Sequence, residues 1–113
     1  MIQTSKMTNG RKVAIVGIGS TKFGEFWGTS LRELVAEAGF SAAEDAGIHG
    51  KDLEMILFGN ISGGMFVGQE HVAALVADFL GLNPIPAVRT EAACASGGGR
   101  PSSRIPRRSL WNV

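Results

Sequence analysis

Met55-Ile-Leu-Phe-Gly59 is a short, continuous apolar run that ends in glycine. An apolar run without polar alternation is typical of a strand buried on both faces of a parallel sheet. Val13-Ala-Ile-Val-Gly-Ile18, which lies between Lys12 and Gly19, has the same character. We predict that it forms the first strand, that Met55–Gly59 forms the second, and that Pro86-Ala-Val-Arg-Thr90 forms a third.

Two amphipathic helices are predicted between these strands. Ser30-Leu-Arg-Glu33 has the spacing of a capping box, and Gly47 is placed to end that helix in the left-handed conformation. The apolar residues of Val72–Leu80 have helical spacing before Gly81, whereas the glycine-rich stretch Ile61–Gly68 is predicted to be a flexible connection. Strands that alternate with helices favour right-handed crossovers, so the predicted class is α/β with a largely parallel sheet.

The length and composition suit one small soluble domain. The chain has 113 residues, of which 44% are hydrophobic. The polar lead at residues 1–11 has no apolar signal region, and no stretch approaches the about 20 apolar residues that cross a bilayer. We therefore expect a cytoplasmic protein without a membrane partner.

Basic residues are concentrated in the last part of the chain. Residues 1–99 hold seven Lys/Arg and all ten Asp/Glu, whereas residues 100–113 hold four arginines and no acid. A nucleic-acid-binding tail is one interpretation of such a run. However, Trp111 is its only aromatic residue and no basic surface precedes it, so no nucleic-acid partner is expected.

Cys94 is the only cysteine and the main candidate for chemistry. It lies in Glu91-Ala-Ala-Cys-Ala-Ser-Gly-Gly-Gly99, just after the third predicted strand. Small neighbours would let a thioester approach the sulfur, and unpaired N–H groups at a helix start would stabilise the thiolate. The alternative is a buried structural cysteine that behaves as a small hydrophobe, which composition alone favours. The spacing of Cys94 to His49 and His71 matches no metal-binding pattern, so no metal is expected.

Two glycine-rich stretches were considered as nucleotide sites. Gly17-Ile-Gly19 follows a predicted strand, but a dinucleotide-binding fingerprint would need glycine where Lys22 stands. Asn60–Gly68 lacks the Gly-Lys-Ser/Thr ending of a phosphate-binding loop. We therefore expect no redox or nucleotide cofactor.

Three segments together resemble one family. The run Glu91-Ala-Ala-Cys-Ala-Ser-Gly-Gly98 is similar to the nucleophile motif of the thiolases, particularly the sterol-carrier-protein and archaeal acetyl-CoA acetyltransferase branch. Val13-Ala-Ile-Val-Gly-Ile-Gly-Ser-Thr-Lys-Phe-Gly24 resembles the opening strand and loop of that branch, and Phe58-Gly-Asn-Ile61 resembles its second strand. The resemblance covers about residues 12–99, and the segments agree in order and spacing.

The resemblance implies a layered α-β-α thiolase fold, of which this chain would hold the first part of the N-terminal half. It also implies a homo-oligomeric parent enzyme, a dimer or tetramer, with an acyl-CoA thioester as substrate and no bound cofactor. Cys94 matches the family's acyl-accepting nucleophile. The family's downstream histidine has no counterpart here, and His49 and His71 are expected to be surface or helix-end residues. We therefore expect the chain to be inactive alone.

Residues 100–113 depart from the family. Where a thiolase continues with an Ala- and Leu-rich helix, this chain reads Arg100-Pro-Ser-Ser-Arg-Ile-Pro-Arg-Arg-Ser-Leu-Trp-Asn-Val113. Pro106 inside a helix would cost about 3 kcal/mol. The chain is thus predicted to comprise a polar lead at 1–11, a partial thiolase N-terminal domain at 12–99 and an aberrant tail at 100–113.

A shifted reading frame would explain the tail. Permitted codons for residues 99–113, read one nucleotide later, can encode Val-Ala-Leu-Arg-His-Ala-Tyr-Leu-Ala-Val-Arg-Ser-Gly-Met, which resembles the expected thiolase helix. The alternative is a non-catalytic interaction module that uses a thiolase-like half fold and contacts its partner through the arginines. Against that alternative, an exposed sheet edge and an uncovered apolar face favour aggregation.

The nucleotide sequence from codon 95 onward separates these two hypotheses. A frameshift predicts that one inserted or deleted base restores a long thiolase-like frame. Codons that are incompatible with the shifted helix would rule the frameshift out and favour the interaction module.

Overall fold

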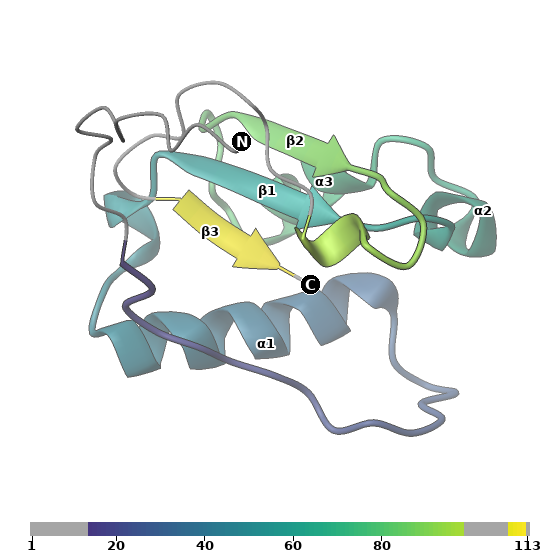
Figure 1. Cartoon of the computed structure of the whole chain (residues 1–113), viewed down its shortest axis with the longest axis horizontal. Coiled ribbons are helices and arrows are strands. Elements are labelled where there is room, and N and C mark those ends of the chain that lie inside the picture. Colours follow the sequence, from purple (N-terminus) through teal and green to yellow (C-terminus); the bar gives the residue numbers. More distant parts are fainter. Residues whose placement is uncertain (1–13, 99–108, 113) are drawn as a thin grey trace, which may run out of the picture.

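The computed structural model describes residues 14–98 and the backbone of residues 109–112, and it has the α/β architecture that the sequence predicts (Figure 1). In the described part, no helix is long and apolar enough to cross a membrane. In chain order the elements are helix α1 (Leu31–Ala46), 3-10 turn η1 (Gly50–Asp52), strand β1 (Met55–Gly59), helices α2 (Gly63–Val67) and α3 (Val72–Phe79), strand β2 (Ala87–Thr90), 3-10 turn η2 (Ser96–Gly98) and strand β3 (Ser109–Asn112).

Strand β1 is the centre of the sheet. The strand order is β2-β1-β3, and β1 pairs in parallel with both neighbours, Leu57 opposite Val88 on one side and opposite Trp111 on the other. Ile56, Leu57 and Phe58 are each at most 3% exposed, so successive side chains on both faces of the strand are buried. The predicted second and third strands and their parallel pairing are therefore confirmed.

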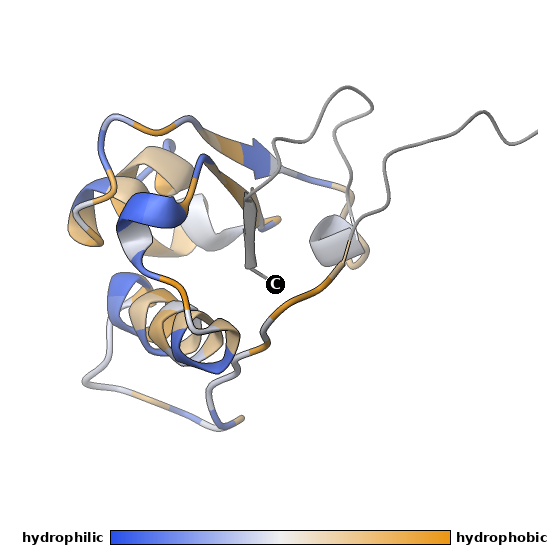
Figure 2. Cartoon of the chain, turned by 90° about the vertical axis from the view of Figure 1, so that its left-hand side faces the viewer, coloured by the Kyte–Doolittle hydropathy of each residue, from blue (hydrophilic) through white to orange (hydrophobic). Residues whose placement is uncertain are grey.

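Helices α1 and α3 lie side by side on one face of this sheet. Val35 of α1 and Val72 and Val76 of α3 pack with Phe58 of β1 in one buried cluster, so both helices must cover the face that carries Phe58. Figure 2, in which α1 is seen end on, shows the two helices next to each other. Burial of this apolar surface is the main favourable contribution to folding here.

The ends of α1 follow the local sequence signals. The Ser30 hydroxyl accepts a hydrogen bond from the Glu33 N–H at 3.3 Å, and the Glu33 carboxylate accepts one from the Ser30 N–H at 2.7 Å. Gly47 ends the helix with a left-handed φ of 66°, which a side chain would disfavour. The predicted capping box and the predicted glycine cap are both confirmed.

The connection from β1 to α3 differs from the prediction. The flexible loop predicted for Ile61–Gly68 instead contains the short helix α2. The Asn60 side-chain oxygen accepts a hydrogen bond from the Gly63 N–H at 2.6 Å, and the Ser62 carbonyl accepts from Met65 and Phe66. These bonds stabilise a single helical turn. The glycines of the segment favoured a loop in the prediction from sequence.

The first predicted strand is wrong for the residues that the structure describes. Ala14 to Ile18 form no strand, and Val13 lies outside the described residues. Because β1 has only two edges and β2 and β3 occupy both, no edge of β1 is left for this segment. Ile15 is consequently 87% exposed despite its apolar side chain, and the predicted crossover from a first strand through α1 to β1 does not form.

The same segment instead runs along α1. The Ile18 N–H donates to the Asp45 carboxylate at 2.9 Å. A side chain at Gly17 would place its Cβ 2.4 Å from the Ala42 carbonyl oxygen, so only glycine fits this contact with the helix. Strand β3 lies in the region predicted to be an aberrant tail, for which the sequence predicted no strand.

The capping box makes the stability of the chain depend on pH. The Ser30 backbone N–H, which donates to the carboxylate, lowers the pKa of Glu33 below its ordinary value of 4.5. A carboxyl whose pKa is lowered by folding contributes stability that is complete above its unfolded pKa and is lost as the pH falls through the folded value. The Glu33→Gln variant should therefore be less stable than the wild type at neutral pH, and this difference should shrink as the pH falls below the ordinary pKa of 4.5.

Urea unfolding from pH 7 to pH 3 measures this effect. Glu37→Gln is the matched control, because Glu37 is on the same helix and its side chain makes no hydrogen bond to the described residues. Equal pH profiles for Glu33→Gln and the wild type would contradict the prediction.

Candidate active site

Cys94 lies on a loop at the carboxyl edge of the sheet. We call residues 91–98 the Cys94 loop; it follows β2 directly. Because β1 and β2 are parallel, their carboxyl ends lie at the same edge, where open α/β sheets bind ligands. The Asn60 N–H donates to the Thr90 carbonyl at 3.1 Å and ties the two strand ends together. The Cys94 thiol is exposed, unlike that of a buried structural cysteine.

The residue before Cys94 has a strained backbone. Ala93 has a φ of 48°, and among the described residues it is the only residue other than glycine with a positive φ. The left-handed conformation costs an alanine on the order of 1–2 kcal/mol, because Cβ crowds the carbonyl oxygen. Such strain persists only where surrounding contacts hold the chain in place, and it is concentrated at functional sites.

Hydrogen bonds to both sides of Ala93 hold this conformation. The Glu91 carboxylate accepts from the Ala93 N–H at 2.7 Å. The Ala93 carbonyl accepts from the Ser96 N–H at 3.1 Å and from the Ser96 hydroxyl at 2.6 Å. The same hydroxyl accepts from the Ala92 N–H at 2.9 Å. Ser96 thus connects the peptide group that precedes Ala92 with the peptide group that follows Ala93.

Ser96 is itself fixed against the central strand. It is 5% exposed, which makes it the only buried polar side chain in the described part of the chain. Its carbonyl accepts from the Thr90 hydroxyl at 3.2 Å. A Cβ at Gly59, the last residue of β1, would lie 2.6 Å from the Ser96 carbonyl oxygen and 2.9 Å from the Gly97 Cα. The loop backbone therefore lies directly against the end of β1.

Three of the N–H groups that follow Cys94, those of Ala95, Ser96 and Gly98, are used inside the loop. The sequence predicted a helix start whose unpaired N–H groups would stabilise the thiolate. Instead, the Ala95 N–H donates to the Ala92 carbonyl and the Gly98 N–H donates to the Ala95 carbonyl, each at 2.9 Å. The structure forms the single 3-10 turn η2 here, and residues 99–108 lie outside the described part.

Both histidines lie at helix ends, as predicted. His49 precedes η1 and the amino end of β1, so it lies at the edge of the sheet opposite to Cys94. His71 precedes α3 and is exposed. Within residues 14–98, neither histidine hydrogen-bonds Cys94, and no three His, Cys, Asp or Glu residues gather as a metal site.

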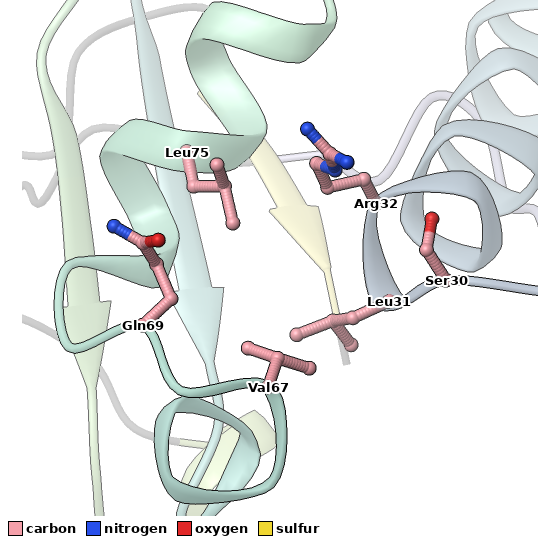
Figure 3. A pocket seen from close by; sticks show the side chains of 6 residues that line it. All are labelled: Ser30, Leu31, Arg32, Val67, Gln69 and Leu75. Atoms are coloured by element: carbon pink, nitrogen blue, oxygen red, sulfur yellow. The ribbon is translucent and has the colours of Figure 1, made fainter.

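Two surface hollows of the described structure are lined by residues other than Cys94. One hollow of about 300 Å³ lies between α1 and the α2–α3 region (Figure 3), and its lining residues are Ser30, Leu31, Arg32, Val67, Gln69 and Leu75. The Arg32 guanidinium lies 5.3 Å from the centre of the Phe79 ring. A shallower hollow of about 690 Å³ extends from Ile61 to Arg89. The candidate active site is therefore defined by the Cys94 loop and lies apart from these two hollows.

Three residues of the site were not identified from the sequence. Ser96 and Glu91 were seen only as parts of the motif around Cys94, and Gly59 only as the end of an apolar run. Serine two residues after a candidate nucleophile is a possible signal, since serine hydroxyls often bond to nearby backbone groups. The contact between Gly59 and Ser96 joins residues far apart in sequence and leaves no local signal.

The contact at Gly59 predicts a specific sensitivity to substitution. In Gly59→Ala the new Cβ would meet backbone atoms that cannot rotate away, so we expect a loss of about 1–3 kcal/mol in the free energy of unfolding and a displaced Cys94 loop. Gly28→Ala is the control, because a Cβ at Gly28 meets nothing within 4 Å. Urea unfolding of both variants measures the effect; equal stability of the two variants would contradict it.

Comparison with known proteins identifies the family. Residues 13–99 match the model of the thiolase N-terminal domain. The chain is 61% identical over 103 residues to an acetyl-CoA acetyltransferase of Methanocaldococcus jannaschii and 54% identical over 88 residues to one of Methanothermobacter thermautotrophicus. These alignments cover 91% and 78% of this chain. A Caenorhabditis elegans protein named non-specific lipid-transfer protein-like 2 is 35% identical over 89 residues, or 76% of this chain.

The alignments cover only part of each relative. The chain spans 25% and 23% of the length of the two acetyl-CoA acetyltransferases, and 20% of that of the lipid-transfer-like protein. The family model nevertheless matches most of the chain, including β1, β2 and the described Cys94 loop. The protein therefore belongs to the thiolase family and has a partial α/β fold of the thiolase N-terminal domain type.

Proposed function

We propose that this chain supplies the nucleophile of a thiolase-type acyltransferase, in which Cys94 accepts an acyl group from an acyl-CoA thioester. The observation that carries the proposal is an exposed thiol held next to a strained residue at the carboxyl edge of a parallel sheet. Two relatives that share more than half of their aligned residues with this chain are named acetyl-CoA acetyltransferases. Acetyl-CoA is accordingly the proposed acyl donor.

The first step is an exchange of one thioester for another. The Cys94 thiolate attacks the carbonyl carbon of the acyl group, a carbon–sulfur bond to Cys94 forms, and the carbon–sulfur bond to coenzyme A breaks. Coenzyme A leaves as a thiolate and takes a proton from solvent. No electrons are transferred, so the step needs no redox cofactor. In the parent enzyme the acyl group would then pass to the carbanion of a second thioester or to another coenzyme A.

Turnover by this chain alone is proposed to be negligible. No described histidine hydrogen-bonds Cys94, and removal of the acid or base partner of a nucleophile costs orders of magnitude in rate. We propose that the chain accepts an acyl group without completing the catalytic cycle. A cytoplasmic location is a further proposal from the amino-acid sequence, and a homo-oligomeric parent enzyme is one that rests on the resemblance to the thiolases.

A non-catalytic interaction module is the second candidate function. The observation that favours it is the apolar surface of α2, where Met65 is 80% exposed and Phe66 is 84% exposed. Exposed apolar patches mark interaction surfaces in soluble proteins. This function would not require acylation of Cys94, so the chemistry of the thiol separates the two candidates.

Peptide mapping after reaction with acetyl-CoA tests the proposal. We expect one acetyl group on the peptide that contains Cys94, and none on that peptide in the Cys94→Ser variant under the same conditions. Urea-unfolded wild type is the control for intrinsic thiol reactivity, and it should be acetylated at least about tenfold more slowly, since loop geometry contributes to rate. Acetylation at equal rates in the folded and unfolded chains, or only on lysines, would contradict the proposed function.

A further inference from the structure

We propose that Ser96 is a positioning residue for Cys94, because its buried hydroxyl holds the strained turn at Ala93 in the conformation that presents the thiol. This inference rests on the proposed acyl transfer to Cys94. It extends that proposal by naming a residue that orients the nucleophile and is not itself proposed to contact the substrate. The supporting evidence is the burial of Ser96 and its hydrogen bonds within the loop.

The hydroxyl of Ser96 bridges two peptide groups by donating a hydrogen bond to one and accepting a hydrogen bond from the other. A serine hydroxyl can donate one hydrogen bond and accept others. It donates to the Ala93 carbonyl at 2.6 Å and accepts from the Ala92 N–H at 2.9 Å. These groups lie before Ala92 and after Ala93, so the hydroxyl restrains the two-residue segment through which the chain enters Cys94. Alanine at position 96 would remove both hydroxyl bonds, so only the backbone bond from position 96 and the exposed Glu91 bond would still hold Ala93 in the left-handed conformation.

The Ser96 hydroxyl can hold the turn in place because contacts with the sheet fix the position of Ser96 itself. Thr90 at the end of β2 donates to the Ser96 carbonyl at 3.2 Å, and Gly59 at the end of β1 lies too close to Ser96 for any side chain. The two paired strands therefore set the position of Ser96, and Ser96 sets the turn before Cys94. Cys94 itself remains exposed for a reactant.

Glu91 provides a second restraint on the same turn. Its carboxylate accepts from the Ala93 N–H at 2.7 Å, but Glu91 is exposed and its bond competes with water. A buried hydrogen bond is not weakened by water in this way. The positioning effect should consequently depend more on Ser96 than on Glu91.

The test measures the acetylation rate of Cys94 against acetyl-CoA concentration for the full chain. In Ser96→Ala we expect the maximal rate to fall by about tenfold to 100-fold, because a nucleophile displaced by about 1 Å loses rate on this scale. The acetyl-CoA concentration at half-maximal rate should stay unchanged, because Ser96 does not bind the substrate. Ser96→Thr, which keeps the hydroxyl, should recover most of the maximal rate.

The control is Ser62→Ala, the same substitution at a serine whose side chain caps no helix and makes no hydrogen bond among the described residues. It should retain the wild-type maximal rate. If Ser96→Ala also acetylates at the wild-type rate, or if Ser96→Thr is as slow as Ser96→Ala, the positioning role of Ser96 is wrong.

Amide hydrogen exchange separates this inference from the proposed function. The Ala92 N–H donates to the Ser96 hydroxyl, so its exchange should be at least about tenfold faster in Ser96→Ala than in Ser62→Ala. Faster exchange in a chain whose wild type is not acetylated would support the Ser96 contact and contradict the acyl-transfer function. Unchanged exchange would contradict the Ser96 inference, whatever the acetylation result.

Discussion

The close contact between Gly59 and the backbone of Ser96 and Gly97 is the constraint on which the candidate site depends. It occurs where β1 ends, so the buried central strand of the sheet determines where the loop after β2 can lie. Only a residue without Cβ allows this approach. The sheet thus provides a rigid base for the loop, and the loop carries the exposed thiol.

The loop combines a strained residue with bonds that hold it. Ala93 is in a conformation that alanine rarely adopts, while the Ser96 hydroxyl and the Glu91 carboxylate accept or donate hydrogen bonds on either side of it. A flexible loop would pay the entropy of ordering each time that a thioester approached. A loop fixed in advance avoids this cost at the moment of reaction, which suits a nucleophile that must meet a carbonyl carbon at a defined angle.

Elements with strong local signals were predicted well from the sequence. The capping residues Ser30, Glu33 and Gly47 set the ends of α1, and the apolar run at β1 predicted both the strand and its burial. Strand β2 was also predicted, but its central residues Val88 and Arg89 are exposed. The strand predicted at 13–18 failed because strand formation depends on a free edge, and both edges of β1 are paired. Helix α2 was not predicted because the glycines of this segment favour a loop. A hydrogen bond from the Gly63 N–H to the Asn60 side chain stabilises the helix instead.

The candidate site was only partly visible in the sequence. Cys94 could be identified because its small neighbours form a recognisable motif, and the exposure of the thiol agrees with a reactive role. The supporting residues depend on contacts between β1, β2 and the loop, which involve positions such as Gly59 and Ser96 that are far apart in the chain. Sequence patterns of short period do not report such contacts.

The central claim is that the folded loop makes Cys94 an acyl acceptor for a coenzyme A thioester. The most direct test is to count the coenzyme A released when the full chain is mixed with excess acetyl-CoA. We expect a rapid release that ends near one coenzyme A per chain, because the sequence has one cysteine and the proposed turnover is negligible. Release that is absent, or that is no faster than with the urea-unfolded chain, would contradict it.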